Sequence, residues 1–185
     1  MAAFASVSDL RILHDDEGLD ETRAQLILDA VSDQIRDTLG WSVTEENDVT
    51  VTLDGPGTEE LLLPTLHLTS VTSVTESGRL LVQGDDFLLY RHGMLRRVVS
   101  GFPIDWTDRP QGITVLFAHG YPADAVPPVF RAVTLDYAGK MLSNPALVPH
   151  SRTVGRVTVS YSDMRAMVPP IDDSRLDTYR LPEGF

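Results

Sequence analysis

The 185-residue sequence contains no cysteine and a single lysine, Lys140. Without cysteine, the chain forms no disulfide bonds and no thiolate metal sites. This suits a protein made in a reducing cytoplasm, or one indifferent to redox state. No apolar run approaches the roughly 18 residues that span a bilayer, and the N-terminus lacks the basic start and apolar core of a signal peptide. We therefore expect no membrane association.

Catalytic signatures are also missing. The sequence has no Gly-x-Ser-x-Gly elbow, no His-Glu-x-x-His pair and no Walker-type lysine. The histidines are dispersed, and His119 stands at the end of an expected strand, where a histidine either acts as a base or, more often, bonds the backbone of a turn. The acidic pairs at 85–86 and 172–173 are neighbours only in sequence. We expect no enzyme, no metal and no cofactor.

The negative charge is concentrated near the N-terminus. The formal net charge is −12, and residues 1–60 contain 15 acidic and 3 basic residues, whereas residues 61–185 contain 12 of each. Such an excess forms either a well-solvated helical face or an acidic surface that repels DNA. In both cases the chain is not expected to wrap nucleic acid.

Helical periodicity predicts a short helix from Ser6 to Leu13 and two longer ones. Asp20 is expected to cap the first long helix and Gly40 to end it. The second opens at the prolines 127–128, where a missing N–H costs nothing, and stops before Asn144. Its apolar surface is broad, which indicates burial against the first helix and against a further partner. The predicted stripe of the first helix contains Ala24, Ile27, Leu28, Val31, Ile35 and Leu39.

Strand and turn signals fill the middle of the chain. Residues 47–118 are expected to form an antiparallel sheet of five to seven short strands, curled on itself. Two hairpin turns are expected, at residues 77–78 and 92–93. A last strand is expected at Arg156–Tyr161. We assign the chain to the α+β class: one domain at 1–162, with a helical core at 6–43 and 127–144 and a β-rich insert at 47–118, followed by an extended C-terminal tail at 163–185.

Several segments, taken together, have a specific order and spacing that runs almost from end to end of the chain. They are Phe4–Leu10, Ala24–Trp41, Val51–Gly57, Leu61–Pro64, Leu68–Val74, Ile113–Tyr121, Val126–Pro127, Leu142–Pro145 and Val157–Tyr161. In this order and spacing the chain resembles the head-to-tail adaptor proteins (head completion or connector proteins) of long-tailed, siphovirus-like phages, especially those of actinobacterial hosts. One departure is the region after Tyr161, which lacks the longer amphipathic helix expected near the C-terminus.

The resemblance implies a virion structural protein in the neck at the capsid vertex, assembled in the host cytoplasm. Members of the family form a homo-oligomeric ring, commonly dodecameric, beneath the portal protein. The ring extends the channel through which double-stranded DNA passes, without sequence specificity, and is the platform for the stopper or the next neck or tail protein.

The resemblance also suggests roles for particular residues. Phe130, Arg131 and Leu135 of the second long helix are expected at a subunit interface. Asp29, Asp33 and Asp37 of the first are expected to face the channel. The residues of the tail expected to bind the portal are Ile171, Leu176, Tyr179, Arg180, Leu181 and Phe185.

Two alternatives remain open from the sequence. The first is a monomeric β-domain that binds carbohydrate or acts as a small hydrolase, with the sheet as its ligand platform. The second is another neck component, such as a stopper or tail terminator. Those proteins are mostly β, and the two expected long helices argue against them.

Overall fold

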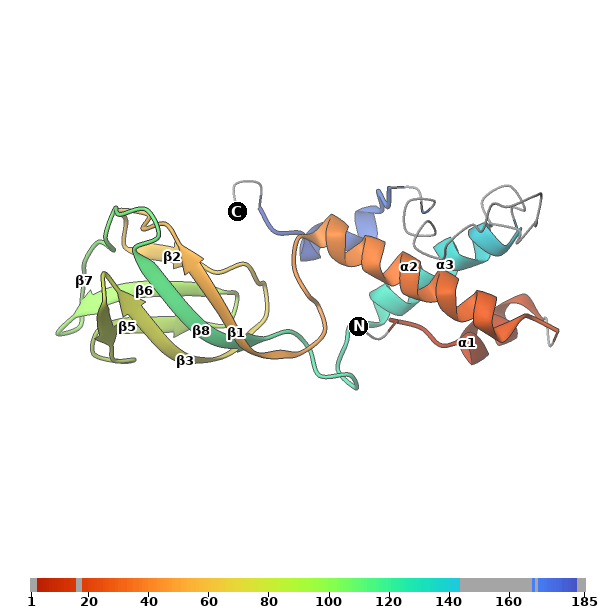
Figure 1. The fold of residues 1–185 in the computed structure, drawn as a ribbon, viewed down its shortest axis with the longest axis horizontal. Coiled ribbons are helices and arrows are strands. Elements are labelled where there is room, and N and C mark those ends of the chain that lie inside the picture. The colour runs from red at the N-terminus through yellow and green to blue at the C-terminus, as the bar shows by residue number, and fades with distance from the viewer. Residues whose placement is uncertain (1–2, 16–17, 144–167, 169, 183–185) are drawn as a thin grey trace, which may run out of the picture. The chain divides into compact units, whose positions relative to one another are not determined.

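The computed structural model describes residues 3–15, 18–143, 168 and 170–182. These residues form two compact units, one helical and one of strands (Figure 1). The helical unit comprises residues 1–40 and 127–180, and the β unit comprises 41–126 with the last residues from 181 onward. The chain is therefore of the mixed helix-and-sheet class. Its helical unit includes residues up to 180 that sequence analysis assigned to a tail.

The described part of the helical unit contains four helices. Helix α2 contacts α3, α1 contacts both, and the 3-10 helix η2 contacts α3. No helix among the described residues has the length and hydrophobicity of a membrane span. The helices are α1 (Val7–His14), α2 (Glu21–Leu39), α3 (Pro128–Ser143) and η2 (Ser174–Tyr179).

Local sequence determines where these helices begin and end. The side chain of Ser6 accepts a hydrogen bond from the Asp9 N–H, and the Asp9 carboxylate accepts one from the Ser6 N–H, which makes a capping box for α1. Asp20 caps α2 by accepting from the N–H of its third residue. Gly40 ends α2 in the left-handed conformation, with φ 78°. The predicted caps of α2, at Asp20 and Gly40, are confirmed.

The predicted apolar stripe of α2 lies inside the helical unit. All six stripe residues of α2 are buried. Helix α3 buries Phe130, Val133, Ala138 and Met141 in the same unit, and η2 adds Leu176. Burial of such side chains is worth about 1.5–3 kcal/mol each, so this core holds the helices together.

The β unit contains eight strands in its described residues, arranged as two antiparallel sheets (Figure 1). The first sheet has the order β1-β8-β3-β4, and the second has the order β2-β6-β5 with β7 paired to β6. The strands are β1 (Glu46–Leu53), β2 (Glu60–Leu62), β3 (Leu68–Glu76), β4 (Arg79–Leu81), β5 (Phe87–Tyr90), β6 (Met94–Val99), β7 (Phe102–Pro103) and β8 (Ile113–His119).

The expectation of one curled sheet is wrong. The chain switches sheets in the connections at 54–59, 63–67, 82–86 and 104–112. At each of these connections the chain crosses to the other sheet and does not turn back along its own sheet as a hairpin. The hairpin at Ser77-Gly78 is confirmed by the Glu76↔Arg79 pairing, whereas the second hairpin has a three-residue connection, because Tyr90 pairs with Met94. The expected strand Arg156–Tyr161 lies outside the described residues.

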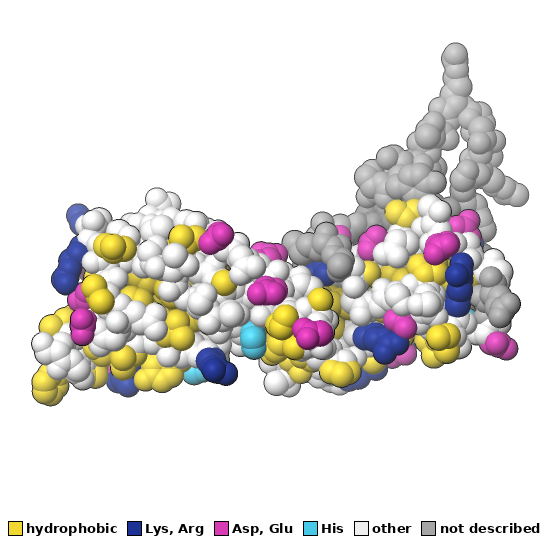
Figure 2. Space-filling model, turned by 90° about the horizontal axis from the view of Figure 1, so that it is seen from below, with side chains coloured by type: hydrophobic (Ala, Val, Ile, Leu, Met, Phe, Trp, Pro, Cys, Tyr) yellow, Lys and Arg dark blue, Asp and Glu magenta, His cyan; other side chains and the backbone are white. Residues whose placement is uncertain are grey.

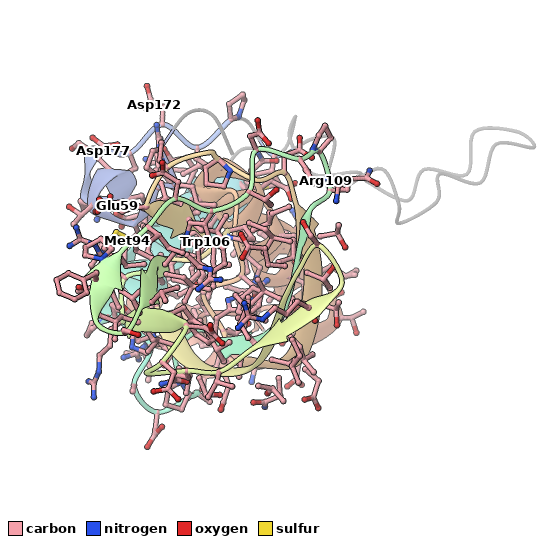
Figure 3. The ribbon with its side chains drawn as sticks, turned by 90° about the vertical axis from the view of Figure 1, so that its left-hand side faces the viewer. Glu59, Met94, Trp106, Arg109, Asp172 and Asp177 are labelled. Atoms are coloured by element: carbon pink, nitrogen blue, oxygen red, sulfur yellow. The ribbon has the colours of Figure 1, made fainter. Side chains whose placement is uncertain are left out.

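The core of the β unit lies between the two sheets. Figure 3 looks toward this unit, with Trp106 inside it, where only 2% of the Trp106 residue is exposed. Both sheets contribute large side chains, including Phe87 and Leu95 from the second sheet and Val115 and Phe117 from the first. The unit therefore has an apolar centre of its own, as an independent compact body requires.

A buried charged cluster also joins the two sheets. Arg97 of β6 is 4% exposed, and its Nε donates to Oε2 of Glu76 on β3 at 3.0 Å. Its Nη1 donates to the backbone oxygens of Asp86 and Val98 at 2.6 and 2.9 Å. The guanidinium lies 5.7 Å from the Trp106 ring centroid. These bonds satisfy a charge that would otherwise be costly to bury.

Candidate assembly surfaces

The three acidic residues expected to face a channel follow one another at four-residue intervals along α2. Asp29 is half-buried and accepts from Gln25 Nε2 at 3.0 Å. Asp33 pairs with Arg36 at 2.9 Å, and Asp37 is exposed. Four-residue spacing brings these carboxylates onto one face of the helix. We call this set, Asp29, Asp33 and Asp37, the acidic stripe.

Of the three residues expected at a subunit interface, Phe130 is fully buried within its own chain. Its ring packs against Tyr179 edge-on, with centroids 4.9 Å apart, and against Phe4 at 5.3 Å. Leu135 is half-buried and Arg131 is exposed. Phe130 therefore presents no surface to another molecule, whereas Leu135 and Arg131 lie on the accessible surface of α3.

Arg131 already has a partner inside the helical unit. Its Nη2 and Nε donate to the two carboxylate oxygens of Asp9 at 2.6 and 3.1 Å, a two-pronged pair between α3 and α1. Hydrogen bonding from Arg131 lowers the pKa of Asp9 to about 2, against the opposing effect of burial. The pair fixes α1 on α3, so Arg131 contributes to the stability of the helical unit.

The described C-terminal segment packs on the helical unit instead of extending away from it. Ile171 and Leu176 are buried, at 2% and 0% exposure, so both expected portal contacts are used inside the chain. Arg175 pairs with Asp136 of α3 at 2.7 Å and with Asp173 at 2.7 Å. This hydrogen bonding from Arg175 lowers the pKa of Asp173.

The accessible part of that segment is its end. Tyr179, Arg180 and Leu181 are half-buried, and Arg180 lies 3.4 Å from the carboxylate of Asp172. Phe185 lies outside the described residues. Residues 174–179, within the tail expected to be extended, form the 3-10 helix η2, which contacts α3 of the same chain and buries Leu176.

An apolar surface on the second sheet was missed by sequence analysis. Leu62, Met94 and Tyr90 are aligned by strand pairing across β2, β6 and β5, and Leu62 is 45% exposed. Beside them Arg96 bonds Glu59 at 2.5 Å. Figure 2 shows apolar side chains at the surface of this unit, and Met94 is labelled in Figure 3. The leucine run at 61–63 could have indicated this surface. Side chains alternate between the two faces of a strand, so the middle leucine points away from the core.

The histidine that attracted attention in the sequence is buried among aromatic side chains. His119 ends β8 and is 4% exposed, with its ring centroid 5.2 Å from Phe117 and 6.3 Å from Trp41. Burial lowers its pKa, although Glu46, whose carboxylate is 3.9 Å from Nε2, acts in the opposite direction. Within the described ranges no three acidic or histidine side chains are grouped to hold a metal.

No protein-family model and no curated protein sequence matches the chain. Among solved structures, the chain is similar to one from the neck of an empty gene transfer agent particle, computed with C6 symmetry. The two chains share 12% identity with a TM-score of 0.52, over 92% of this chain and 83% of that one. A chain from the neck of a native particle, computed with C12 symmetry, shares 13% identity with a TM-score of 0.49, over 96% and 92%.

The chain therefore shares its fold with a chain from the neck of a gene transfer agent particle. The coverage of 92% leaves too few residues for either unit to be an unmatched addition. The similarity in fold therefore extends over both the helical and the β unit.

Proposed function

We propose that the chain is a structural neck protein of a phage-like particle: a head-to-tail adaptor that assembles as a closed ring beneath the portal. The role is architectural and not catalytic. The single observation that carries the proposal is the fold shared with a gene transfer agent neck chain. A fold at 12% identity does not fix function, so the surfaces of this chain supply the further support.

We propose a number of copies that fits the symmetry of a related structure. The related neck structure is computed with C6 symmetry, and a ring on a six-fold axis contains six copies or a multiple of six. We propose twelve, as the adaptor family leads one to expect. In such a ring each copy contacts the next through two different surfaces. We assign the accessible surface of α3, with Leu135 and Arg131, to one of them.

The acidic stripe supports a role in DNA passage. Within such a ring we place Asp29, Asp33 and Asp37 toward the channel. Carboxylates repel the phosphate backbone and form no counterion-releasing contacts with it. Duplex DNA would then pass without being held, as a conduit requires.

The C-terminal end supports a contact with the portal. Tyr179, Arg180 and Leu181 keep accessible surface while Leu176 anchors η2 on the helical unit. We propose that this half-exposed end, followed by Phe185, docks against the portal protein. The apolar surface of the second sheet, Leu62, Tyr90 and Met94, is then available to the stopper or the next tail protein.

The experiment that tests the function uses particle heads assembled without this chain. Purified chain added to such heads is expected to restore tail joining, which is counted by electron microscopy. A heat-unfolded sample of the same protein is the control. Heads that join tails equally well without the chain would show that it is no adaptor, and a melting shift with sugars would favour a carbohydrate-binding β-domain.

A further inference from the structure

The hairpin that joins β6 to β7 carries exposed apolar side chains. Val99 pairs with Phe102 across the turn Ser100-Gly101, in which both residues have positive φ, 52° and 82°. A two-residue turn of this kind matches the twist of its strands, so the hairpin holds its side chains in defined positions. Phe102 is 74% exposed, and Val99 and Ile104 are exposed beside it. The hairpin therefore presents an aromatic side chain to the surroundings of the β unit.

Two more exposed apolar residues belong to a segment that is bonded to this hairpin. Leu80 and Val82 flank the buried Leu81, so alternation places both on the outer side of the chain. The Asp86 N–H donates to the Val82 oxygen at 2.8 Å, and the Asp86 oxygen accepts from the Val98 N–H of β6 at 2.9 Å. These bonds join the segment after β4 to the end of β6. We call the five exposed residues Leu80, Val82, Val99, Phe102 and Ile104 the apolar tip.

The apolar tip is more than a scatter of exposed side chains. Five of the nine large apolar residues that are exposed in the described structure belong to it. Hydrophobic side chains are visible at the left-hand end of the β unit in Figure 2, which is the β7 end in Figure 1. Single exposed apolar residues are normal, whereas a group of large ones bordered by polar residues is typical of a contact site. The tip is at the Val99 end of β6, and the surface that includes Met94 is at the other end.

The free charges that border the apolar tip are negative. Asp85 and Asp105 are exposed, and neither forms an ion pair within the described part of the chain. Arg79, in contrast, is balanced by Asp86 at 3.0 Å. Free carboxylates repel anionic lipid headgroups and DNA phosphates, but they form strong hydrogen bonds with arginine or lysine side chains. The tip therefore fits a protein surface better than a membrane or a nucleic acid.

We propose that the apolar tip inserts into an apolar pocket, bordered by arginine or lysine side chains, on the next protein of the neck or tail. This inference rests on the proposed function, in which the helical unit supplies the ring and portal contacts and the β unit remains for the tail side. Phe102 is the central anchor, since buried aromatic side chains contribute most of the energy of many interfaces. Asp85 and Asp105 pair with the basic border and orient the partner.

The test uses particle heads assembled without this chain, together with isolated tails. The natural chain or Phe102→Ser is added to the heads, and the amount of chain bound to heads is measured by quantitative blotting. Tails joined per bound chain are then counted by electron microscopy. The matched control is Ile12→Ser, which removes a large apolar residue that is 81% exposed on the helical unit. Thermal melting shows that each variant is folded.

A second pair of variants tests the charged border. Asp85→Lys combined with Asp105→Lys reverses the charge beside the apolar tip. Glu45→Lys combined with Asp124→Lys makes the same change in charge at exposed positions before β1 and after β8. The first variant is expected to join at least three-fold fewer tails per bound chain, and the second is expected to join as many as the natural chain. Equal effects of the two variants would overturn the proposed basic border.

Phe102→Ser is expected to bind heads as the natural chain does and to join at least ten-fold fewer tails, while Ile12→Ser joins them normally. Unchanged tail joining by Phe102→Ser would overturn this inference alone, whereas a natural chain that joins no tails would refute the adaptor function as well. Loss of head binding by Phe102→Ser would assign the tip to the portal or to another copy and overturn the inference. Binding of the natural chain, but not of Phe102→Ser, to vesicles of phosphatidylcholine and phosphatidylglycerol would overturn it in favour of a lipid surface.

Discussion

Arg97 and Glu76 form an ion pair, 3.0 Å between Nε and Oε2, that connects the second sheet of the β unit to the first. Both side chains are largely buried, with 5% and 14% exposure. The other oxygen of Glu76 accepts from the N–H of Thr107 at 2.7 Å, in the connection that leads back to β8. The pair therefore holds two strands and a sheet crossing in one arrangement.

Replacing Arg97 by Met is expected to lower the free energy of unfolding of the β unit by about 3–5 kcal/mol, because the largely buried carboxylate of Glu76 loses its charged partner. The measurement is urea unfolding followed by tryptophan fluorescence, to which Trp106 contributes from inside the unit. The matched control is Arg96→Met on the same strand. Arg96 bonds Glu59 on a partly exposed surface, so its loss is expected to cost under about 1 kcal/mol. Equal losses would contradict a special role for Arg97.

The Asp9–Arg131 pair predicts a specific dependence of stability on acid. The folded chain holds the pKa of Asp9 at about 2, below its ordinary value of 3.8. A carboxylate with a depressed pKa stabilises the fold above pH 4, and this contribution is lost as the pH falls toward 2. Over that window the native chain is expected to lose about 1–2 kcal/mol more than Asp9→Asn. Thermal melting of both proteins at several pH values checks this expectation. Parallel curves of melting temperature against pH would exclude a contribution from the Asp9–Arg131 pair.

The signals that predicted correctly were local ones. A helix end is determined by residues close to it in the sequence, as at Ser6, Asp20 and Gly40, because a cap satisfies backbone groups of its own helix turn. The Ser77-Gly78 hairpin is equally local, since positive φ at both residues sets the turn. Such features can be identified from one short stretch of sequence without knowledge of the rest of the fold.

The features that escaped prediction depend on contacts between distant segments. In Met94–Val99 two arginines are adjacent, and alternation places one on each side of the sheet, but it does not say which side is the core. Likewise the sequence analysis expected Phe130 at a subunit interface, and no local signal showed that Phe4 and Tyr179 of the same chain would bury it. The division of the strands between two sheets also depends on contacts between distant segments, so local signals did not predict it.

The proposed interface on α3 predicts that a substitution there prevents ring assembly while the chain remains folded. Leu135→Asp is expected to abolish ring formation while lowering the free energy of unfolding by no more than about 2 kcal/mol, because the side chain is only half-buried. Size-exclusion chromatography measures the first effect and thermal melting the second. The same substitution at Leu80, which is 64% exposed on the β unit, serves as the control. Rings that persist in Leu135→Asp would remove α3 from the interface.

The acidic stripe predicts how assembled rings behave toward DNA. Replacing Asp29, Asp33 and Asp37 by Lys is expected to make rings bind duplex DNA at least ten-fold more tightly, with affinity that falls steeply as salt is raised. A control with the same change in charge replaces Asp85, Asp105 and Asp108, which are exposed on the β unit. Fluorescence anisotropy at two salt concentrations compares them. Equal gains in both variants would show that the stripe does not line the channel.

The most direct measurement is native mass spectrometry of the purified chain with and without portal rings. Our account predicts a closed assembly of twelve copies, alone or once the portal is present, and no intermediate oligomers at saturation. A chain that stays monomeric at every concentration, with the portal present, would contradict it.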